Sequence, residues 1–266
     1  MAYVRTHFES PPRKTVQPAI RRISVADLKD ALRKGFDDLM EIPTFAVFVV
    51  VVYPVIGLFL MWLTFGYEWF PLLFPLVAGF PLIAPFAALA LYELSRRREA
   101  GLPVSWTALD DISVSRIRAC FALGLVLLAL FGIWIGTAMM LYDYIFAGWV
   151  PPSLGAFMHE VFTTRPGATL IVVGCGIGLI FALIVFAISA ISFPLVLDRD
   201  VDAATAMRTS IRAVSENPAT MGLWAVIIAG TLVLASLPFL AGLIVALPFL
   251  GHATWHLYRK LVEPVD

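Results

Sequence analysis

The sequence is dominated by long stretches without a charged residue. They run over 43–67, 69–92, 119–142, 166–197 and 217–258. A helix of about 20 apolar residues spans a bilayer core about 30 Å thick, because each residue rises about 1.5 Å. Each stretch reaches that length, and the last is long enough for two crossings. Because a helix also satisfies its own backbone hydrogen bonds in hydrocarbon, we predict an all-α membrane protein.

Six transmembrane helices account for these stretches. We predict them over 44–64, 70–92, 119–142, 168–196, 219–237 and 239–257. Pro238 separates the last two, since proline lacks an amide proton and disfavours helix at the residue before it. A re-entrant hairpin over 219–257 is the alternative to two full crossings.

The basic residues are distributed unequally between the two sides of this arrangement. All of the 19 Lys and Arg residues except Arg165 fall in segments that six crossings place on one side. Cytoplasmic loops carry such an excess, so we expect both termini in the cytoplasm and a location in the inner membrane. We interpret 23–262 as a single polytopic domain, preceded by a disordered basic tail over 1–22. The formal net charge is +0, which gives no indication of nucleic-acid binding.

Two segments before pairs of apolar stretches resemble each other. Residues 27–43 align without gaps to 202–218, and the apolar positions keep register. Those positions are Leu28, Leu32, Phe36 and Leu39 in the first copy and Ala203, Met207, Ile211 and Val214 in the second. Their spacing places each set on one helical face. We therefore predict amphipathic cytoplasmic-surface helices over 24–42 and 202–217, with these faces in the headgroup boundary. Because each copy precedes a pair of apolar stretches, we also predict an internal repeat of surface helix plus hairpin.

Two histidines are the strongest candidates for a binding site. His252 and His256 are four residues apart and share one helical face, a spacing that metal sites use. Two ligands are too few for a closed zinc site. We favour two interfacial histidines that bond backbone, lipid headgroups or neighbouring loops, with a metal or haem-edge site as the alternative. No other cofactor is predicted.

Charged and polar residues at the ends of the predicted spans indicate structural or interface roles. These residues are Asp198, Arg199, Asp200, Arg96, Arg97, Arg98, Trp255, Asn217 and Pro218. We expect 198–200 to form an ion-pair collar with 96–98 across the cytoplasmic face, and a site for a charged partner is the alternative. Trp255 is expected at the inner membrane interface, which aromatic residues favour.

Charged groups are absent from the middle of every predicted span. In membranes such groups mark ion pathways and proton relays, so their absence argues against a proton-coupled pump or a voltage sensor. The sequence also lacks a phosphate-binding glycine loop, a nucleophile elbow and an HExxH motif. We therefore expect a protein that is not an enzyme.

Several segments, taken in order, resemble a bacterial family. They are Gly35-Phe36-Asp37-Asp38, Tyr92-Glu93-Leu94-Ser95-Arg96-Arg97, Pro194-Leu195-Val196-Leu197-Asp198-Arg199, Ser210 with Asn217-Pro218, and Gly251-His252-Ala253-Thr254-Trp255-His256-Leu257-Tyr258-Arg259. Over roughly residues 20–262 the chain resembles the domain of unknown function 2189. The resemblance implies an integral membrane protein, mostly from proteobacteria, and some members carry a label as cytochrome c oxidase subunits.

Three functions stay open at this point. A scaffold, accessory subunit or assembly factor is favoured, since no ionisable group is expected in the spans. A transporter or lipid-handling channel is the second, motivated by the repeat and the proline-broken helices. A metal- or haem-handling protein linked to a terminal oxidase is the third and rests on His252 and His256. The expected partners are the lipid bilayer and either a membrane-protein complex or further copies of this chain.

Overall fold

The computed structural model describes residues 18–42, 84–104, 112–237 and 242–264, with short pieces at 57, 71–72 and 75–76. Regular structure within these ranges is helical, apart from one antiparallel bridge between Ile20 and Val262. The predicted all-α class is therefore confirmed. The predicted span over 44–64, except for residue 57, and much of the first half of the span over 70–92 lie outside the described residues.

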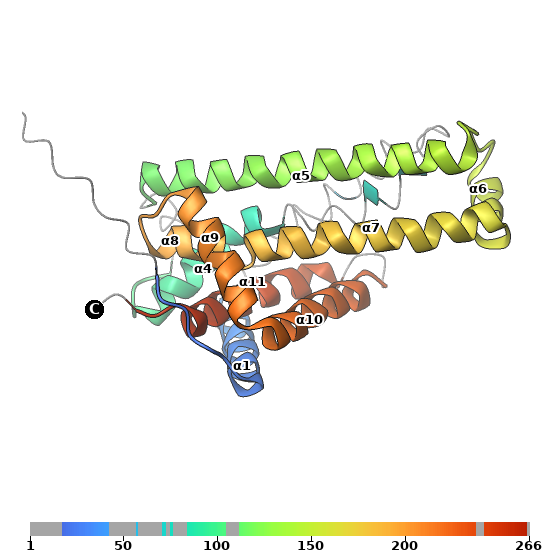
Figure 1. Cartoon of the computed structure of the whole chain (residues 1–266). Helices are drawn as coiled ribbons and strands as arrows, with labels where there is room; N and C mark the ends of the chain where they lie inside the picture. Colours follow the sequence, from blue (N-terminus) through green and yellow to red (C-terminus); the bar gives the residue numbers. More distant parts are fainter. Residues whose placement is uncertain are drawn as a thin grey trace, which may run out of the picture.

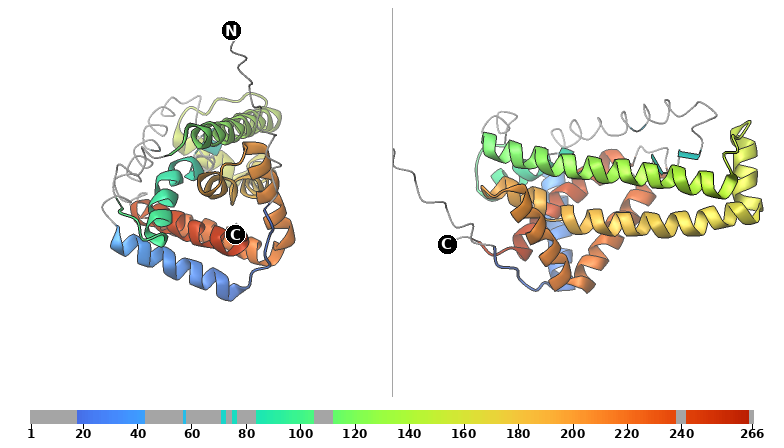
Figure 2. Two further views of the ribbon diagram at one scale, coloured as in Figure 1. Left: turned by 90° about the vertical axis from the view of Figure 1, so that its left-hand side faces the viewer. Right: turned by 45° about the horizontal axis from the view of Figure 1, so that its top comes forward.

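The helices form a long hairpin joined to a cluster of shorter elements (Figure 1). They are α1 (Val25–Glu41), α4 (Ala84–Glu99), α5 (Val114–Phe146), α6 (Leu154–Thr163), α7 (Arg165–Ser189), α8 (Ser192–Asp198), α9 (Ala203–Glu216), α10 (Pro218–Ser236) and α11 (Leu243–Leu261). Helices α5 and α7 run side by side along the long axis, and α6 connects them at one end (Figures 1 and 2). At the opposite end lie α1, α4, α8, α9 and the last turns of α11, which we call the charged end.

Three helical stretches are long and apolar enough to cross a membrane. They are Val114–Phe146, Arg165–Asp198 and Pro218–Ser236, judged by length and composition over the described residues. They include the predicted spans over 119–142 and 168–196 and nearly all of the one over 219–237. In the apolar windows of these stretches only 28%, 6% and 11% of the residues are buried, as expected for helices that face lipid.

The sixth predicted span, 239–257, is not confirmed. Helix α11 begins at Leu243 and continues to Leu261, and it does not qualify as a candidate span. Its second half carries polar residues and is buried against α1 and α4. That half therefore belongs to the protein interior at the charged end, and a second full crossing over 239–257 stays a prediction.

Side-chain caps set where the helices begin. The Ser24 hydroxyl accepts a hydrogen bond from the Asp27 N–H, and the Asp27 carboxylate accepts one from the Ser24 N–H, which completes a capping box. Asp202 caps α9 by accepting from the Thr205 N–H at 2.6 Å. Both helices match the predicted surface helices over 24–42 and 202–217 to within a residue or two.

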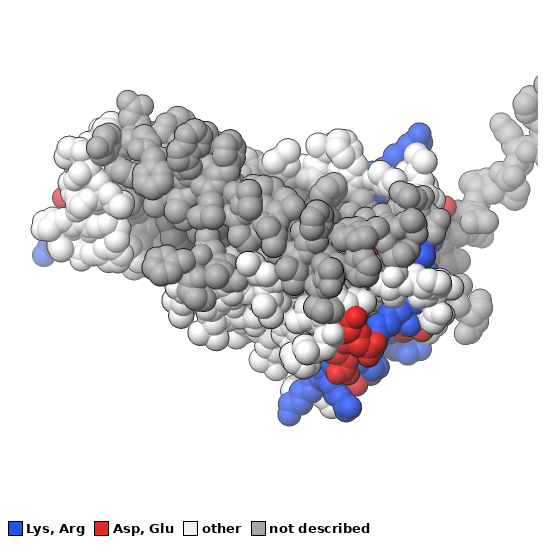
Figure 3. Space-filling model, turned by 180° about the vertical axis from the view of Figure 1, so that it is seen from behind, with Lys and Arg blue, Asp and Glu red and all other residues white. Residues whose placement is uncertain are grey.

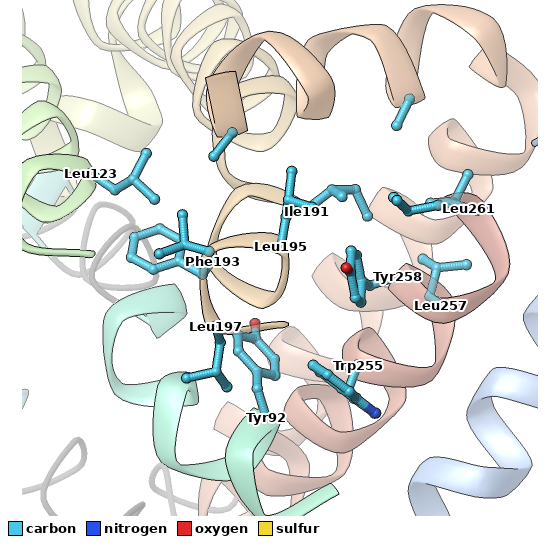
Figure 4. Close-up of a cluster of buried hydrophobic side chains, with 14 of the residues drawn as sticks. Tyr92, Leu123, Ile191, Phe193, Leu195, Leu197, Trp255, Leu257, Tyr258 and Leu261 are labelled. Carbon is cyan, nitrogen blue, oxygen red and sulfur yellow. The ribbon is translucent and has the colours of Figure 1, made fainter. Parts of the chain in front are cut away.

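The buried apolar core is centred on α8. Its residues Phe193, Leu195, Val196 and Leu197 are completely buried, together with Ile191 just before the helix. Figure 4 shows these side chains between α4, α5 and α11, which contribute Tyr92, Leu123, Trp255 and Tyr258. The Ile191 N–H donates to the Ser210 hydroxyl of α9 at 3.1 Å, where α7 ends and α8 begins. The predicted span over 168–196 is thus two successive helices.

The two ends of the described chain are held together. The Arg21 N–H donates to the Leu261 carbonyl at 2.8 Å, and the Glu263 N–H donates to the Ala19 carbonyl at 3.1 Å. Residues 18–22, which we expected to belong to a disordered tail, are therefore ordered, because their backbone pairs with the segment after α11. Both described chain ends lie at the charged end.

Charged side chains gather at the charged end (Figure 3). Among the described Lys and Arg residues, Arg165 stands apart, since it begins α7 beside α6 at the opposite end. The apolar hairpin lies between the two ends. The separation of the basic residues by a membrane stays a prediction.

Candidate functional site: a buried polar cluster

Close packing of α1 on α11 brings polar residues together at the charged end. Ala31 and Ala253 are completely buried, and a Cβ atom on Gly35 would lie 2.5 Å from the Ala253 backbone nitrogen. Only glycine allows the two helix backbones to approach this closely. Asp38, three residues after Gly35, is therefore pressed toward α11.

This contact also corrects the predicted orientation of α1. Leu28 and Leu39, which we expected in the headgroup boundary, are buried in the protein, whereas Phe36 is 53% exposed. The physical reason is that α11 packs against the narrow face formed by the small residues Ala31 and Gly35. The leucines flank that face, and Phe36 points away from it.

Asp38 is the centre of the buried polar cluster and is only 2% exposed. Its Oδ2 accepts a hydrogen bond from the Ser95 hydroxyl of α4 at 2.5 Å and lies 2.9 Å from Nε2 of His256. Its Oδ1 pairs with the Arg98 guanidinium, which also donates to Glu41 with an Nε–Oε2 distance of 2.9 Å. The three helices α1, α4 and α11 thus converge on one carboxylate.

The charge of Asp38 is stabilised by these partners. Burial alone would raise the pKa of the carboxyl group, because it disfavours the charged form. Hydrogen bonds from His256, Ser95 and Arg98 outweigh that effect and hold the pKa of Asp38 below its ordinary value. Asp38 is therefore a carboxylate at neutral pH.

His252 extends the cluster by one residue and is completely buried. Its Nδ1 lies 2.7 Å from the Ser95 hydroxyl oxygen. Because Ser95 has one proton and donates it to Asp38, the oxygen accepts from a protonated Nδ1. The remaining lone pair is then on Nε2, which has no hydrogen-bond partner in the described part of the chain.

These contacts change the interpretation of the two histidines. His252 and His256 are held by Ser95 and Asp38 of other helices, rather than by lipid, backbone or loops. A neutral imidazole with an oriented Nδ1 and a free Nε2 is the form that binds metals. Within the described ranges, however, no group of three His, Cys, Asp or Glu residues is placed to hold an ion.

Comparison with known families gives a match for the middle part of the chain. Residues 73–198 match a family described as predicted integral membrane protein (DUF2189). The match confirms the resemblance to this family over 73–198, which is part of the range of roughly 20–262 inferred from the sequence. No curated protein and no solved structure matches the chain. The DUF2189 segment contributes Ser95 and Arg98 to the cluster, whereas Asp38 and the two histidines lie outside it.

The DUF2189 segment also contains the predicted arginine cluster. Glu93, one turn earlier on α4, accepts from Arg96 at 2.7 Å and from Arg97 at 2.9 Å. Arg98 pairs instead with Asp38 and Glu41 of α1. Residues of α4 and α1 therefore supply the acids of these ion pairs, and Asp198 adds an electrostatic attraction to Arg96. The collar between 198–200 and 96–98 stays a prediction.

Asp198, at the end of the DUF2189 segment, has different partners. It accepts a hydrogen bond from the Tyr258 hydroxyl at 2.6 Å and lies 3.5 Å from the Arg259 guanidinium. Arg199 donates to the Glu263 carbonyl, and Asp200 is exposed. These contacts attach the end of α8 to α11, because both helices reach the charged end at the same level.

Of the other predicted interface residues, Trp255 and Asn217 are buried in the protein, whereas Pro218 is exposed. Trp255, expected at the membrane interface, is completely buried and donates to Glu99 of α4 at 3.0 Å. Asn217 ends α9, accepts from the Ile23 N–H at 2.9 Å and donates to the Arg21 carbonyl at 3.1 Å. Pro218 begins α10 directly after it. Both positions therefore act in packing and chain connection.

Sequence reasoning missed the central residues Asp38, Ser95 and Glu93. One signal was available for Asp38. It follows Gly35 by three residues and Ala31 by seven, so it lies on the same small-residue face of α1. An acid on a face that is otherwise suited to close packing indicates a buried ion pair. No comparable pattern marks Ser95.

Proposed function

We propose that this integral membrane protein is a non-enzymatic scaffold or accessory protein of the bacterial inner membrane. One observation carries the proposal: ionisable groups are gathered at the charged end, where they join α1, α4 and α11 to one another. By contrast, the stretches over 119–142 and 166–197 contain no Asp, Glu, Lys or Arg. Transport coupled to ions or protons ordinarily requires such groups within the membrane.

The polar cluster supports a structural role because its members bind one another. Asp38 engages Ser95, His256 and Arg98, and Arg98 also engages Glu41. Networks of this kind, when satisfied, rigidify a fold. The result is a firm platform at one end of a set of apolar helices, which suits the docking of a partner.

Site-specific photo-crosslinking in intact membranes tests the scaffold. A benzoylphenylalanine at Leu102, which is exposed next to α4, is expected to capture a discrete partner. The same probe at Met158 on α6, exposed at the opposite end, is the matched control. Because some family members are labelled as oxidase subunits, a terminal oxidase is the first partner to examine. If the probe at Leu102 gives no specific crosslinked product and the protein purifies without a partner, the proposed scaffold role is wrong.

The proposed orientation places both chain ends in the cytoplasm. The excess of basic residues at the charged end supports it, because such residues resist translocation. A reporter that is active only in the periplasm should stay inactive when fused after residue 105 or after residue 260. Activity at either position would rule out this orientation.

A metal- or haem-handling role is the second candidate, and the free Nε2 of His252 favours it. Titration of the purified protein with Cu(I), Zn²⁺ or haem is the test. Binding should be lost in the double variant His252→Ala, His256→Ala if these residues are ligands. Identical titration curves for the variant and the wild type would remove this candidate.

A further inference from the structure

The outer face of α1 has an unusual combination of side chains. Lys29, Arg33, Phe36 and Met40 follow one another at spacings of four, three and four, so they form one stripe on the helix. Phe36 is 53% exposed and Met40 is 62% exposed. The stripe lies away from Gly35, which faces α11. Two cations and two large apolar side chains are thus presented together, which we call the α1 stripe.

The two cations of the stripe are not neutralised within the described chain. On the flank of the helix, Lys34 and Lys260 both pair with Asp30, at 3.1 Å and 2.7 Å. Lys29 and Arg33 make no such ion pair among the residues that the structure describes. Exposed Asp37 borders the stripe, which leaves one net positive charge on it.

The position of α1 suits contact with a membrane surface. Helix α1 lies across the direction of the long helices α5 and α7 (Figure 2). It packs against α11 and also contacts α10, which is a candidate membrane span. The axis of α1 therefore runs roughly parallel to the expected membrane plane, next to one of the apolar helices.

We propose that the α1 stripe binds the surface of anionic phospholipids. Phe36 and Met40 enter the boundary between headgroups and acyl chains, and Lys29 and Arg33 contact phosphate groups through long, flexible side chains. Each cation near an anionic surface strengthens the attraction about fivefold. The proposal depends on the membrane location of the chain and is independent of the scaffold role.

Helix α9 repeats part of this arrangement. Arg208 and Ile211, which align with Arg33 and Phe36, are both exposed, and Ile211 is 46% exposed. On the opposite face, Ser210 aligns with Gly35 and is completely buried. A basic residue followed three positions later by an exposed apolar one is thus present on both amphipathic helices.

A lipid surface fits the α1 stripe better than a protein partner does. Stable protein interfaces bury about 800 Å² on each partner, with an apolar centre that excludes charge. Two apolar side chains beside two cations, with one net positive charge, do not form such a centre. An extended anionic layer with an apolar interior satisfies both kinds of side chain at once.

Native mass spectrometry of the detergent-purified full-length protein tests the lipid preference. Wild type is expected to retain phosphatidylglycerol in preference to phosphatidylcholine. Arg33→Gln should weaken that preference about fivefold. Lys34→Gln removes the same charge from the next residue, which is already paired with Asp30, and should leave the preference nearly unchanged. Equal losses in the two variants, or no preference in wild type, would overturn the proposal.

Insertion of the apolar side chains requires a second measurement. In a background with Cys120→Ala and Cys175→Ala, an environment-sensitive fluorophore attached to a cysteine at Met40 should shift its emission to the blue in phosphatidylglycerol nanodiscs. The same fluorophore attached to a cysteine at Lys34 should keep the emission of a probe exposed to water. Matching spectra at the two positions argue against insertion. A stripe variant that converts a dimer into a monomer would show that a second copy, rather than lipid, covers this face.

Discussion

The charged end and the hairpin of α5, α6 and α7 are stabilised by different means. At the charged end, side chains far apart in sequence bind one another: His256 and Asp38 are separated by 218 positions, and Ser95 and His252 by 157. The hairpin exposes apolar side chains along its length. Between its helices, the rings of Trp134 and Phe181 pack with their centroids 5.6 Å apart. The charged end therefore combines long-range polar contacts with the buried apolar core around α8, whereas few side chains of the hairpin are buried.

The largest expected effect comes from removing the central carboxylate. Asp38→Ala leaves Arg98 and His256 without their buried partner, which should lower the free energy of unfolding by about 3–5 kcal/mol. Chemical denaturation in detergent measures it. Asp37→Ala, an exposed neighbour with the same change of charge, should have little effect. Comparable losses in both variants would mean that the cluster does not hold the charged end together.

Gly35→Ala should have the next largest effect. The new Cβ would lie 2.5 Å from the Ala253 backbone nitrogen, so the helices must separate, at a cost of about 1–3 kcal/mol. Gly132→Ala on α5 is the matched change in the hairpin, where nothing lies within 4 Å, and it should be neutral in a thermal unfolding assay. If the hairpin variant is the less stable one, the comparison between the two regions is wrong.

Asn217→Ala tests the attachment of the N-terminal segment. The loss of the bonds to Ile23 and Arg21 should lower stability by about 1–2 kcal/mol. Hydrogen exchange over 18–23 should become faster, while exchange in α5 stays unchanged. Ser215→Ala, on the exposed side of α9, provides the control. Unaltered protection of 18–23 in the Asn217 variant would show that the backbone pairing with Leu261 is sufficient.

The smallest effect concerns pH. The pKa of folded Asp38 is lowered, so its contribution to stability is present above the pKa of an unfolded aspartate, about 3.9, and is lost as the pH falls through the folded value. Unfolding midpoints between about pH 5 and pH 2 should therefore decline less steeply, as the pH falls, for Asp38→Asn than for wild type. Arg98 keeps its charge throughout this range, so it does not add to the slope. Parallel pH profiles would contradict a charged Asp38 in the folded cluster.

Features that depend on nearby residues were predictable from the sequence. The capping box of Ser24 and Asp27, the bounds of α1 and α9, and the position of Pro218 at the start of α10 all follow from local rules. The apolar stretches of α5, α7 and α10 follow from length and composition. The repeat of surface helix plus hairpin stays a hypothesis.

Features that depend on tertiary contacts were not predictable. Periodicity identified the correct helices. It predicted that the leucine face of α1 lies in the headgroup boundary, because the spacing of apolar residues does not show that Gly35 allows a close backbone contact with α11. Likewise, one sequence does not reveal that Arg98 binds Asp38, 60 positions away, rather than Asp198. The same limit hid the contact of both histidines with that carboxylate.

The packing of α1 on α11 has a consequence for biogenesis. The ribosome makes α1 before every other described helix, and its main partner is the last to be made. Until α11 has been made, Gly35 and Asp38 have no α11 to contact, so the small-residue face of α1 stays uncovered. The nascent α1 therefore lacks its main partner while the helices between them are made. An anionic bilayer surface that binds the α1 stripe would keep α1 next to the site where α11 later packs.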